Sequence, residues 1–128
     1  MDGNRTLSKR ERLQRDYEFR RIYERGRKTE GRFAVLYVME TPRDANAPVI
    51  PERRAVGFVT SRKVGNAVQR NRARRLLREA YRLNKHKLKT NLQMVIISRV
   101  GIRGKSLREV ETSLLDMLQA AGVLAETR

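Results

Sequence analysis

The residues of this chain that are best suited to chemistry are arginines gathered in one short stretch. Residues 70–82 contain six of them: Arg70, Arg72, Arg74, Arg75, Arg78 and Arg82. Arginine offers a planar fork of N–H donors that matches phosphate and also stacks on bases. Solvated helix faces usually mix the two signs of charge, because opposite charges three or four residues apart attract each other. Like charges crowd together here, which favours a polyanion as the binding partner.

Other kinds of catalysis are excluded by residue type. The chain has no cysteine, which rules out disulfides, thiol nucleophiles and Cys-ligated zinc. Its one histidine, His86, excludes a two-histidine ribonuclease mechanism and a multi-histidine metal site within one chain. His86 lies between two lysines and is expected to be an exposed member of a basic segment. A protein-only nuclease needs clustered acids for two metals, and Glu109, Glu111 and Asp116 fall on one predicted helix without that geometry.

The positive charge is concentrated in one part of the chain. The formal net charge is +16, and residues 60–89 carry eleven bases and one acid, or +10 of that excess. We expect residues 1–128 to form one domain, with residues 1–15 as an irregular basic arm and residues 41–53 as a mobile loop. The N-terminal segment has no apolar signal-peptide core, and no stretch is apolar enough to span a membrane. The expected protein is soluble and cytoplasmic, without a membrane partner.

Hydrophobic periodicity predicts an α+β fold. Asn66 is an N-cap residue type, Ser106 with Glu109 makes a capping box, and Gly26 and Gly122 are placed to end helices. The expected elements are a helix at 16–25, strands at 32–40 and 54–60, a helix at 67–85, a strand at 92–98 and a helix at 107–121. The order α-β-β-α-β-α predicts a single-domain α-β sandwich, with helices over a small sheet.

Two of the predicted elements carry both apolar and functional candidates. In the 67–85 helix the apolar side is predicted to be Ala73, Leu76, Leu77, Ala80 and Tyr81, with the arginines opposite. In the first helix Phe19, Ile22 and Tyr23 form one stripe. Core packing and a binding role are equal alternatives for Phe19 and Tyr23. The strand at 32–40 is apolar on both faces. We therefore expect either that other elements cover both faces or that one face forms the base of a binding site.

The segment GNAVQRNRARRLLRE, residues 65–79, resembles the RNR signature of the bacterial ribonuclease P protein subunit. The opening segment LSKRERLQRDYEFRRIYERGR, the strand FAVLYVM and the approach TSRKVGNAV are similar to that family in order and spacing. The resemblance covers residues 7 to 121, and its specificity lies in the long arginine-rich motif. It implies an α-β sandwich with a left-handed β-α-β crossover around the RNR helix, whereas the general rule predicts a right-handed connection.

The resemblance also implies a function. Members of the family are noncatalytic cofactors of a ribozyme that removes the 5′ leader from precursor transfer RNA. As a family member the chain would be the protein subunit of an endoribonuclease holoenzyme, with no catalytic residue and no metal of its own. Mg²⁺ held by the RNA subunit would perform the hydrolysis. The implied partners are the catalytic RNA and the single-stranded leader, with no protein partner.

Site residues carry over from the family position by position. Three aromatic positions match the central cleft that holds the leader, although many relatives have Phe where this chain has Tyr23: Phe19, Tyr23 and Tyr37. The positions expected to face the catalytic RNA are those of the entry loop and the RNR segment: Lys63, Gly65, Asn66, Arg70, Asn71, Arg72, Arg74, Arg75 and Arg78. For Asn66, helix capping and RNA binding are compatible roles.

One alternative function stays open on the residues alone. A ribosomal or other structural RNA-binding protein would share the basic charge and the size, but it would need no cleft for a leader.

Overall fold

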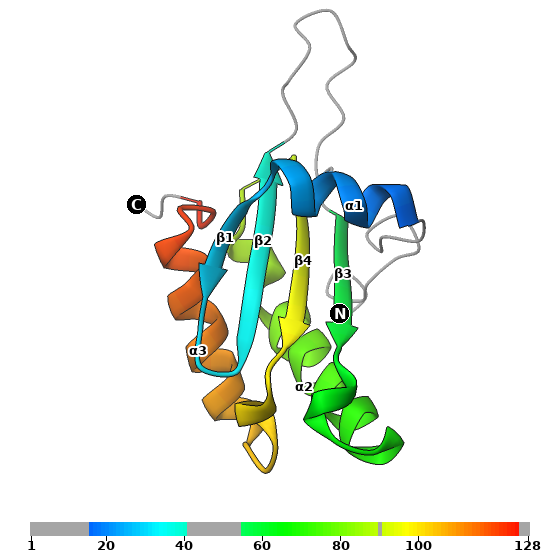
Figure 1. Cartoon of the computed structure of the whole chain (residues 1–128). Coiled ribbons are helices and arrows are strands. Elements are labelled where there is room, and N and C mark those ends of the chain that lie inside the picture. The colour runs from blue at the N-terminus through cyan, green and yellow to red at the C-terminus, as the bar shows by residue number, and fades with distance from the viewer. Residues whose placement is uncertain (1–15, 41–54, 90, 126–128) are drawn as a thin grey trace, which may run out of the picture.

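The computed structural model describes residues 16–40, 55–89 and 91–125, so the predicted basic arm and the loop at 41–53 lie outside the described residues. Four strands form one sheet in the order β1-β2-β4-β3 (Figure 1). Pairing is antiparallel between β1 and β2 and between β2 and β4, and parallel between β3 and β4. The strands are β1 (Arg27–Glu30), β2 (Ala34–Glu40), β3 (Ala55–Thr60) and β4 (Leu92–Ser98).

The helices follow the predicted positions closely. They are α1 (Asp16–Arg25), α2 (Ala67–Asn84) and α3 (Leu107–Ala120), with short 3₁₀ turns η3 (Arg62–Val64), η4 (Lys85–Lys87) and η5 (Val100–Ile102). Asn66 caps α2, and Ser106 and Glu109 form the predicted capping box on α3. The predicted α+β architecture is confirmed. None of the helices in the described ranges is both long and apolar enough to span a membrane.

Strand β1 was not predicted. Its sequence, RKTE, has no apolar residue, and only Thr29 is partly buried. The strand forms because its backbone pairs with β2, where Arg27 lies opposite Val38 and Lys28 opposite Tyr37. Hydrophobic alternation cannot detect such an edge strand, since its stability comes from the ladder of hydrogen bonds and not from burial.

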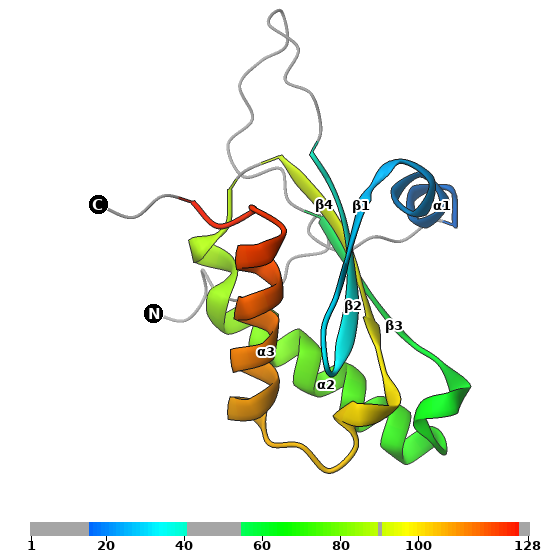
Figure 2. The same ribbon diagram turned by 60° about the vertical axis from the view of Figure 1, so that its left-hand side comes forward.

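The sheet separates two layers of helices (Figure 2). Helices α2 and α3 pack on one face and enclose the main core, in which Leu36, Ile96, Leu77 and Leu114 are almost completely buried. Helix α1 packs on the other face against β2 and β4, through Ile22, which has no exposed surface. The chain therefore presents two different outer surfaces, one on each side of the same sheet.

The connection from β3 through α2 to β4 is a left-handed crossover. The two strands are parallel neighbours. In Figure 1 both arrows point down, β4 lies to the left of β3, and α2 lies behind the sheet, which makes the path left-handed. The general preference for right-handed connections gives the wrong hand here. The hand implied by the family resemblance is confirmed.

Gly26 ends α1 as predicted, but not through a left-handed backbone. Positive φ among the described glycines occurs at other positions, such as Gly122, where α3 stops. A Cβ at residue 26 would lie 2.5 Å from the carbonyl oxygen of Ile22 and 2.9 Å from that of Val38. Glycine is needed because the end of α1 passes close to the backbone of β2.

Candidate nucleic-acid interface

The start of α2 is held by its own side chains. Asn66 Oδ1 accepts a hydrogen bond from Gln69 N at 2.9 Å, and Gln69 Oε1 accepts one from Asn66 N at 2.9 Å. Gly65 precedes this capping box with a φ of 145°, and a Cβ there would collide with the Gln69 side chain. The Ser61 hydroxyl accepts a hydrogen bond from Lys63 N at 3.0 Å and begins η3. These bonds fix the direction in which α2 leaves the sheet, and with it the direction of its arginines.

Helix α2 has one buried side and one basic side. The buried side holds the apolar residues that were predicted, with Leu76 only partly covered: Ala73, Leu76, Leu77, Ala80 and Tyr81. On the other side Asn71, Arg72, Arg75 and Arg78 are exposed, and Arg70 and Arg74 are partly exposed. These six residues are called the basic face of α2 below. Because the buried side anchors the helix, the basic face is presented to solvent on a rigid element.

The basic face has little internal neutralisation. Arg82 pairs with Glu79, with Arg82 Nε donating to Glu79 Oε2 at 2.9 Å, and this hydrogen bond lowers the pKa of the Glu79 carboxyl. In the part of the chain that the structure describes, no ion pair joins an arginine of the basic face to a carboxylate. Arg74 donates to Asn71 Oδ1 at 3.2 Å, and the Arg78 guanidinium lies 5.9 Å from the centre of the Phe58 ring. Asn71 and Phe58 orient guanidinium groups without removing their charge.

The first turn of α2 has no acidic residue, in contrast to the other helices. Asp16 and Glu18 lie in the first turn of α1, and Glu109 lies in that of α3. Acidic side chains at this position oppose the partial positive charge of a helix N-terminus. The N-terminal end of α2 therefore adds to the positive charge of its arginines.

An aromatic cluster lies on the opposite side of the sheet. Phe19 and Tyr23 are four residues apart on α1 and so share one face of the helix. Tyr23 packs edge-to-face on Tyr37 of β2, with ring centres 5.1 Å apart and an interplanar angle of 85°. Tyr23 is 39% exposed, whereas its neighbour Ile22 is fully buried. Of the predicted stripe, Ile22 therefore fills the interior, and the Tyr23 ring remains open to a ligand.

The hydroxyl of Tyr23 stays protonated over the neutral pH range. Partial burial, with a smaller contribution from Tyr37, raises the pKa of the Tyr23 hydroxyl above its ordinary value. A neutral phenol can donate a hydrogen bond to RNA and does not repel phosphate.

Two cations beside the aromatic cluster were missed by sequence reasoning. Lys28 Nζ lies 6.0 Å from the centre of the Tyr37 ring, across the β1–β2 pair. Arg21 extends from α1, and its Nη2 donates to Gln93 Oε1 of β4 at 3.1 Å. Lys28 could be found only by predicting β1, whose sequence carries no hydrophobic signal. Arg20 and Arg21 both lie between Phe19 and Tyr23 in the sequence, so the sequence indicates a cation there but not which of the two reaches β4.

The predicted site residues fall into two groups. The structure brings Lys63, Gly65 and Asn66 to the N-terminal end of α2, next to the basic face. It does not bring the aromatic cluster to the basic face, because α1 and α2 lie on opposite sides of the sheet (Figure 2). His86 is exposed in η4, as expected. Within residues 16–40, 55–89 and 91–125, no group of three or more His, Cys, Asp or Glu side chains is arranged to hold a metal ion.

These features define a class of protein, the small basic α+β domains that present an arginine-rich helix face to solvent. A profile of the family described as Ribonuclease P matches residues 7–122. The ribonuclease P protein component of Clostridium novyi is 35% identical over 117 residues, which cover 91% of this chain and 98% of that protein. The chain belongs to the bacterial ribonuclease P protein family.

Solved structures agree with this assignment. The RNase P protein of Staphylococcus aureus superposes with a TM-score of 0.74 and 26% identity, covering 90% of this chain and 98% of that one. The RNase P protein of Thermotoga maritima gives a TM-score of 0.72 and 25% identity, covering 87% and 97%. Family membership does not favour the ribosomal alternative and makes the chain a protein component of an endoribonuclease holoenzyme with an RNA partner.

Proposed function

We propose that the chain binds the catalytic RNA of ribonuclease P through the basic face of α2 and the 5′ leader of precursor transfer RNA through the aromatic cluster. The observation that carries the first assignment is the basic face itself, a row of guanidinium groups that pair with no carboxylate of the described residues, on a helix anchored by its buried side. Guanidinium groups bind phosphates, which every RNA presents, so this face suits a partner bound over many contacts.

The aromatic cluster supports the second assignment. A single-stranded leader exposes the faces of its bases, and stacking on an aromatic ring contributes roughly 1–3 kcal/mol per base. Tyr23 is open to solvent, and Lys28 lies beside Tyr37, where it can meet the backbone of a stacked strand. Paired RNA hides its base faces, so this cluster discriminates in favour of the leader.

Catalysis is assigned to the RNA subunit. Hydrolysis of the phosphodiester would use Mg²⁺ held by that RNA, while the protein positions the leader and neutralises phosphates. The chain's own residues supply no general acid or nucleophile to this step. Because precursor transfer RNA is processed where it is made, we place the protein in the cytoplasm.

The test is reconstitution with a bacterial ribonuclease P RNA at low Mg²⁺, assayed by cleavage of precursor transfer RNA. We expect the RNA alone to be nearly inactive at low Mg²⁺, the protein alone to cleave nothing, and the mixture to restore cleavage. Nuclease-treated, RNA-free protein is the necessary control. Robust metal-dependent cleavage by that preparation would place the active site in the protein and overturn the proposal.

A further inference from the structure

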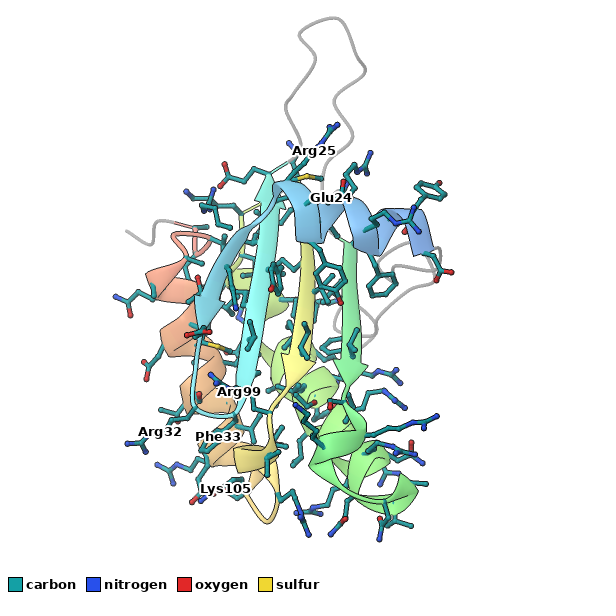
Figure 3. All side chains as sticks on the ribbon, in the orientation of Figure 1. Glu24, Arg25, Arg32, Phe33, Arg99 and Lys105 are labelled. Carbon is teal, nitrogen blue, oxygen red and sulfur yellow. The ribbon has the colours of Figure 1, made fainter. Side chains whose placement is uncertain are left out.

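A second basic surface lies at the end of the sheet where η5 follows β4. It comprises residues from the β1–β2 turn, from the two ends of η5 and from the loop that leads into α3, and is called the η5 patch: Arg32, Phe33, Arg99, Arg103 and Lys105. Figure 3 shows Arg32, Phe33, Arg99 and Lys105 together at this end, with Glu24 and Arg25 of α1 at the other end. None of these five residues belongs to the basic face of α2 or to the aromatic cluster.

The patch is held in place by short contacts between its segments. Arg99 Nη1 donates to the carbonyl oxygen of Gly31 at 3.0 Å, and Arg99 N donates to that of Phe33 at 2.9 Å. Lys105 Nζ lies 5.7 Å from the centre of the Phe33 ring. Arg32, Arg99 and Arg103 are exposed, and Lys105 is partly exposed. The cations are therefore displayed on a fixed scaffold.

The patch is continuous with α2. Arg72, a member of the basic face, extends its Nη2 to 3.4 Å from the carbonyl oxygen of Lys105. Between the two segments runs a groove lined in part by Gln69 and Arg72 of α2 and by Ile102 and Arg103. The neighbouring turns η3 and η5 are also in contact. An RNA that lies on the N-terminal half of α2 is thus within reach of the η5 patch.

Among the described residues, no ion pair joins a cation of the patch to a carboxylate. Residues 99–108 contain four bases and no acid. A second groove runs beside the patch, between the β1–β2 turn and α3, and three acids line it. Glu30 Oε1 lies 3.4 Å from Lys28 Nζ, and Glu109 Oε2 accepts a hydrogen bond from Ser106 N at 3.0 Å. Asp116, the third, lies two turns further along α3. The groove between α2 and η5, by contrast, has Arg72 and Arg103 and no acidic residue in its lining, so positive charge dominates where the patch adjoins α2.

We propose that the RNA-binding surface of α2 continues onto the η5 patch, and that Arg103 and Lys105 bind phosphates of the same catalytic RNA. The Phe33 ring is partly buried against the core and lies beneath Lys105, so the patch offers charge and not an open stacking platform. Charge without stacking fits the sugar–phosphate backbone of folded RNA better than an unpaired leader. This inference rests on the proposed function, since it assigns further contacts to the same partner.

The first experiment compares two pairs of charge removals by binding to catalytic RNA over a range of salt. Arg103→Gln with Lys105→Gln changes the patch, and Lys87→Gln with Lys89→Gln removes two exposed lysines near the C-terminal end of α2. If each patch residue meets one phosphate, the log–log salt slope becomes shallower by about 2 and affinity at physiological salt falls roughly tenfold. We expect less than a twofold change for the control pair. Equal affinity and slope in the patch variant and the parent would overturn the inference.

A second experiment identifies the RNA at the patch. Because the chain has no cysteine, Val100→Cys and Val68→Cys each create a unique attachment point for a hydroxyl-radical probe. Both valines are exposed, Val100 in η5 and Val68 in the first turn of α2. We expect both probes to cut the catalytic RNA at neighbouring positions in its folded structure. Cutting from Val68 alone, or cutting of the leader from Val100, would reject the inference and leave the proposed function standing. No cutting of catalytic RNA from either position would reject both.

Discussion

The basic face of α2 and the aromatic cluster lie on opposite sides of the same sheet, and they are built in different ways. The basic face is an extended row of charges on one helix, fixed by the Asn66–Gln69 capping box and by burial of the opposite side of α2. The aromatic cluster joins a helix and a strand, because Tyr23 of α1 packs edge-to-face on Tyr37 of β2. Charge acts over distance and tolerates many RNA shapes, whereas stacking requires an unpaired base. The comparison teaches that affinity and selectivity can be separated by mutation in this chain.

The largest expected effect is a difference between the two surfaces in how strongly salt weakens their binding to RNA. If about six cations contact phosphates, the log–log slope for catalytic RNA is about −4 to −5, a loss of roughly 300- to 1,000-fold between 50 and 200 mM salt. A short single-stranded leader makes fewer phosphate contacts and should lose much less. Filter binding of both RNAs to the parent protein measures this. A nearly flat dependence for the catalytic RNA would mean that the basic face is not its binding surface.

The next effect concerns Tyr37. We predict that Tyr37→Ala weakens precursor binding to the holoenzyme by roughly 1–3 kcal/mol, because one base loses its stacking partner. Binding of mature transfer RNA should change little, since it has no leader. Tyr37→Phe keeps the ring and is the matched control, with near-parental affinity expected. Equal losses for precursor and mature RNA, in a variant shown by circular dichroism to be folded, would reject the leader role.

A smaller effect is expected from single arginines of the basic face. Arg75 is exposed on α2, so Arg75→Ala should weaken catalytic-RNA binding about five- to tenfold and make the salt slope shallower by about 1. Arg72→Ala should behave similarly. The melting temperature should stay close to that of the parent, because little core packing is lost. A collapsed melting transition with unchanged affinity per folded molecule would make these arginines structural.

The smallest effect is the pH dependence contributed by Tyr23. Its raised pKa means that the folded protein holds the hydroxyl proton more tightly than the unfolded chain does. The associated stabilisation is complete below about pH 10, the ordinary tyrosine value, and is lost as the pH rises through the folded-state pKa. Thermal melts of the parent should therefore lose stability above pH 10 more steeply than those of Tyr23→Phe. Identical curves for the two proteins would show that this hydroxyl does not contribute.

Sequence reasoning found the basic face more completely than its surroundings. The 3.6-residue period from Ala73 to Tyr81 identifies the buried side of α2, and the arginines opposite it follow directly. Asn66 was predicted as a cap, but its reciprocal bond with Gln69 depends on side-chain geometry that spacing alone does not give. Strand β1 was missed because an edge strand made of RKTE has no hydrophobic signal.

The η5 patch was missed for a different reason. Over residues 90–128 five bases and four acids nearly cancel, which hides the four bases of residues 99–108. Three of those four acids lie on α3, such as Glu111, whose Oε2 accepts a hydrogen bond from Asn84 Nδ2 at 2.9 Å. Only the fold separates them from Arg99 and Arg103, by turning the chain between η5 and α3. A shorter averaging window would have exposed the cluster, although not its continuity with Arg72.

The acid-free first turn of α2 has a consequence for how fast, and in which orientation, the protein meets its RNA. The helix terminus contributes roughly half a positive charge, directed along the axis, at the same end of the domain as η3 and the first arginines of α2. Residues 60–89, which include α2, carry +10 of the net charge of +16, so the charge is unevenly distributed and the molecule has an electric dipole as well as a net charge. In the field of a polyanion this dipole turns the protein before contact, and more encounters begin with α2 facing the RNA. The association rate constant should therefore exceed that of an equally charged protein with evenly spread cations, and the advantage should fade as salt shortens the reach of the field.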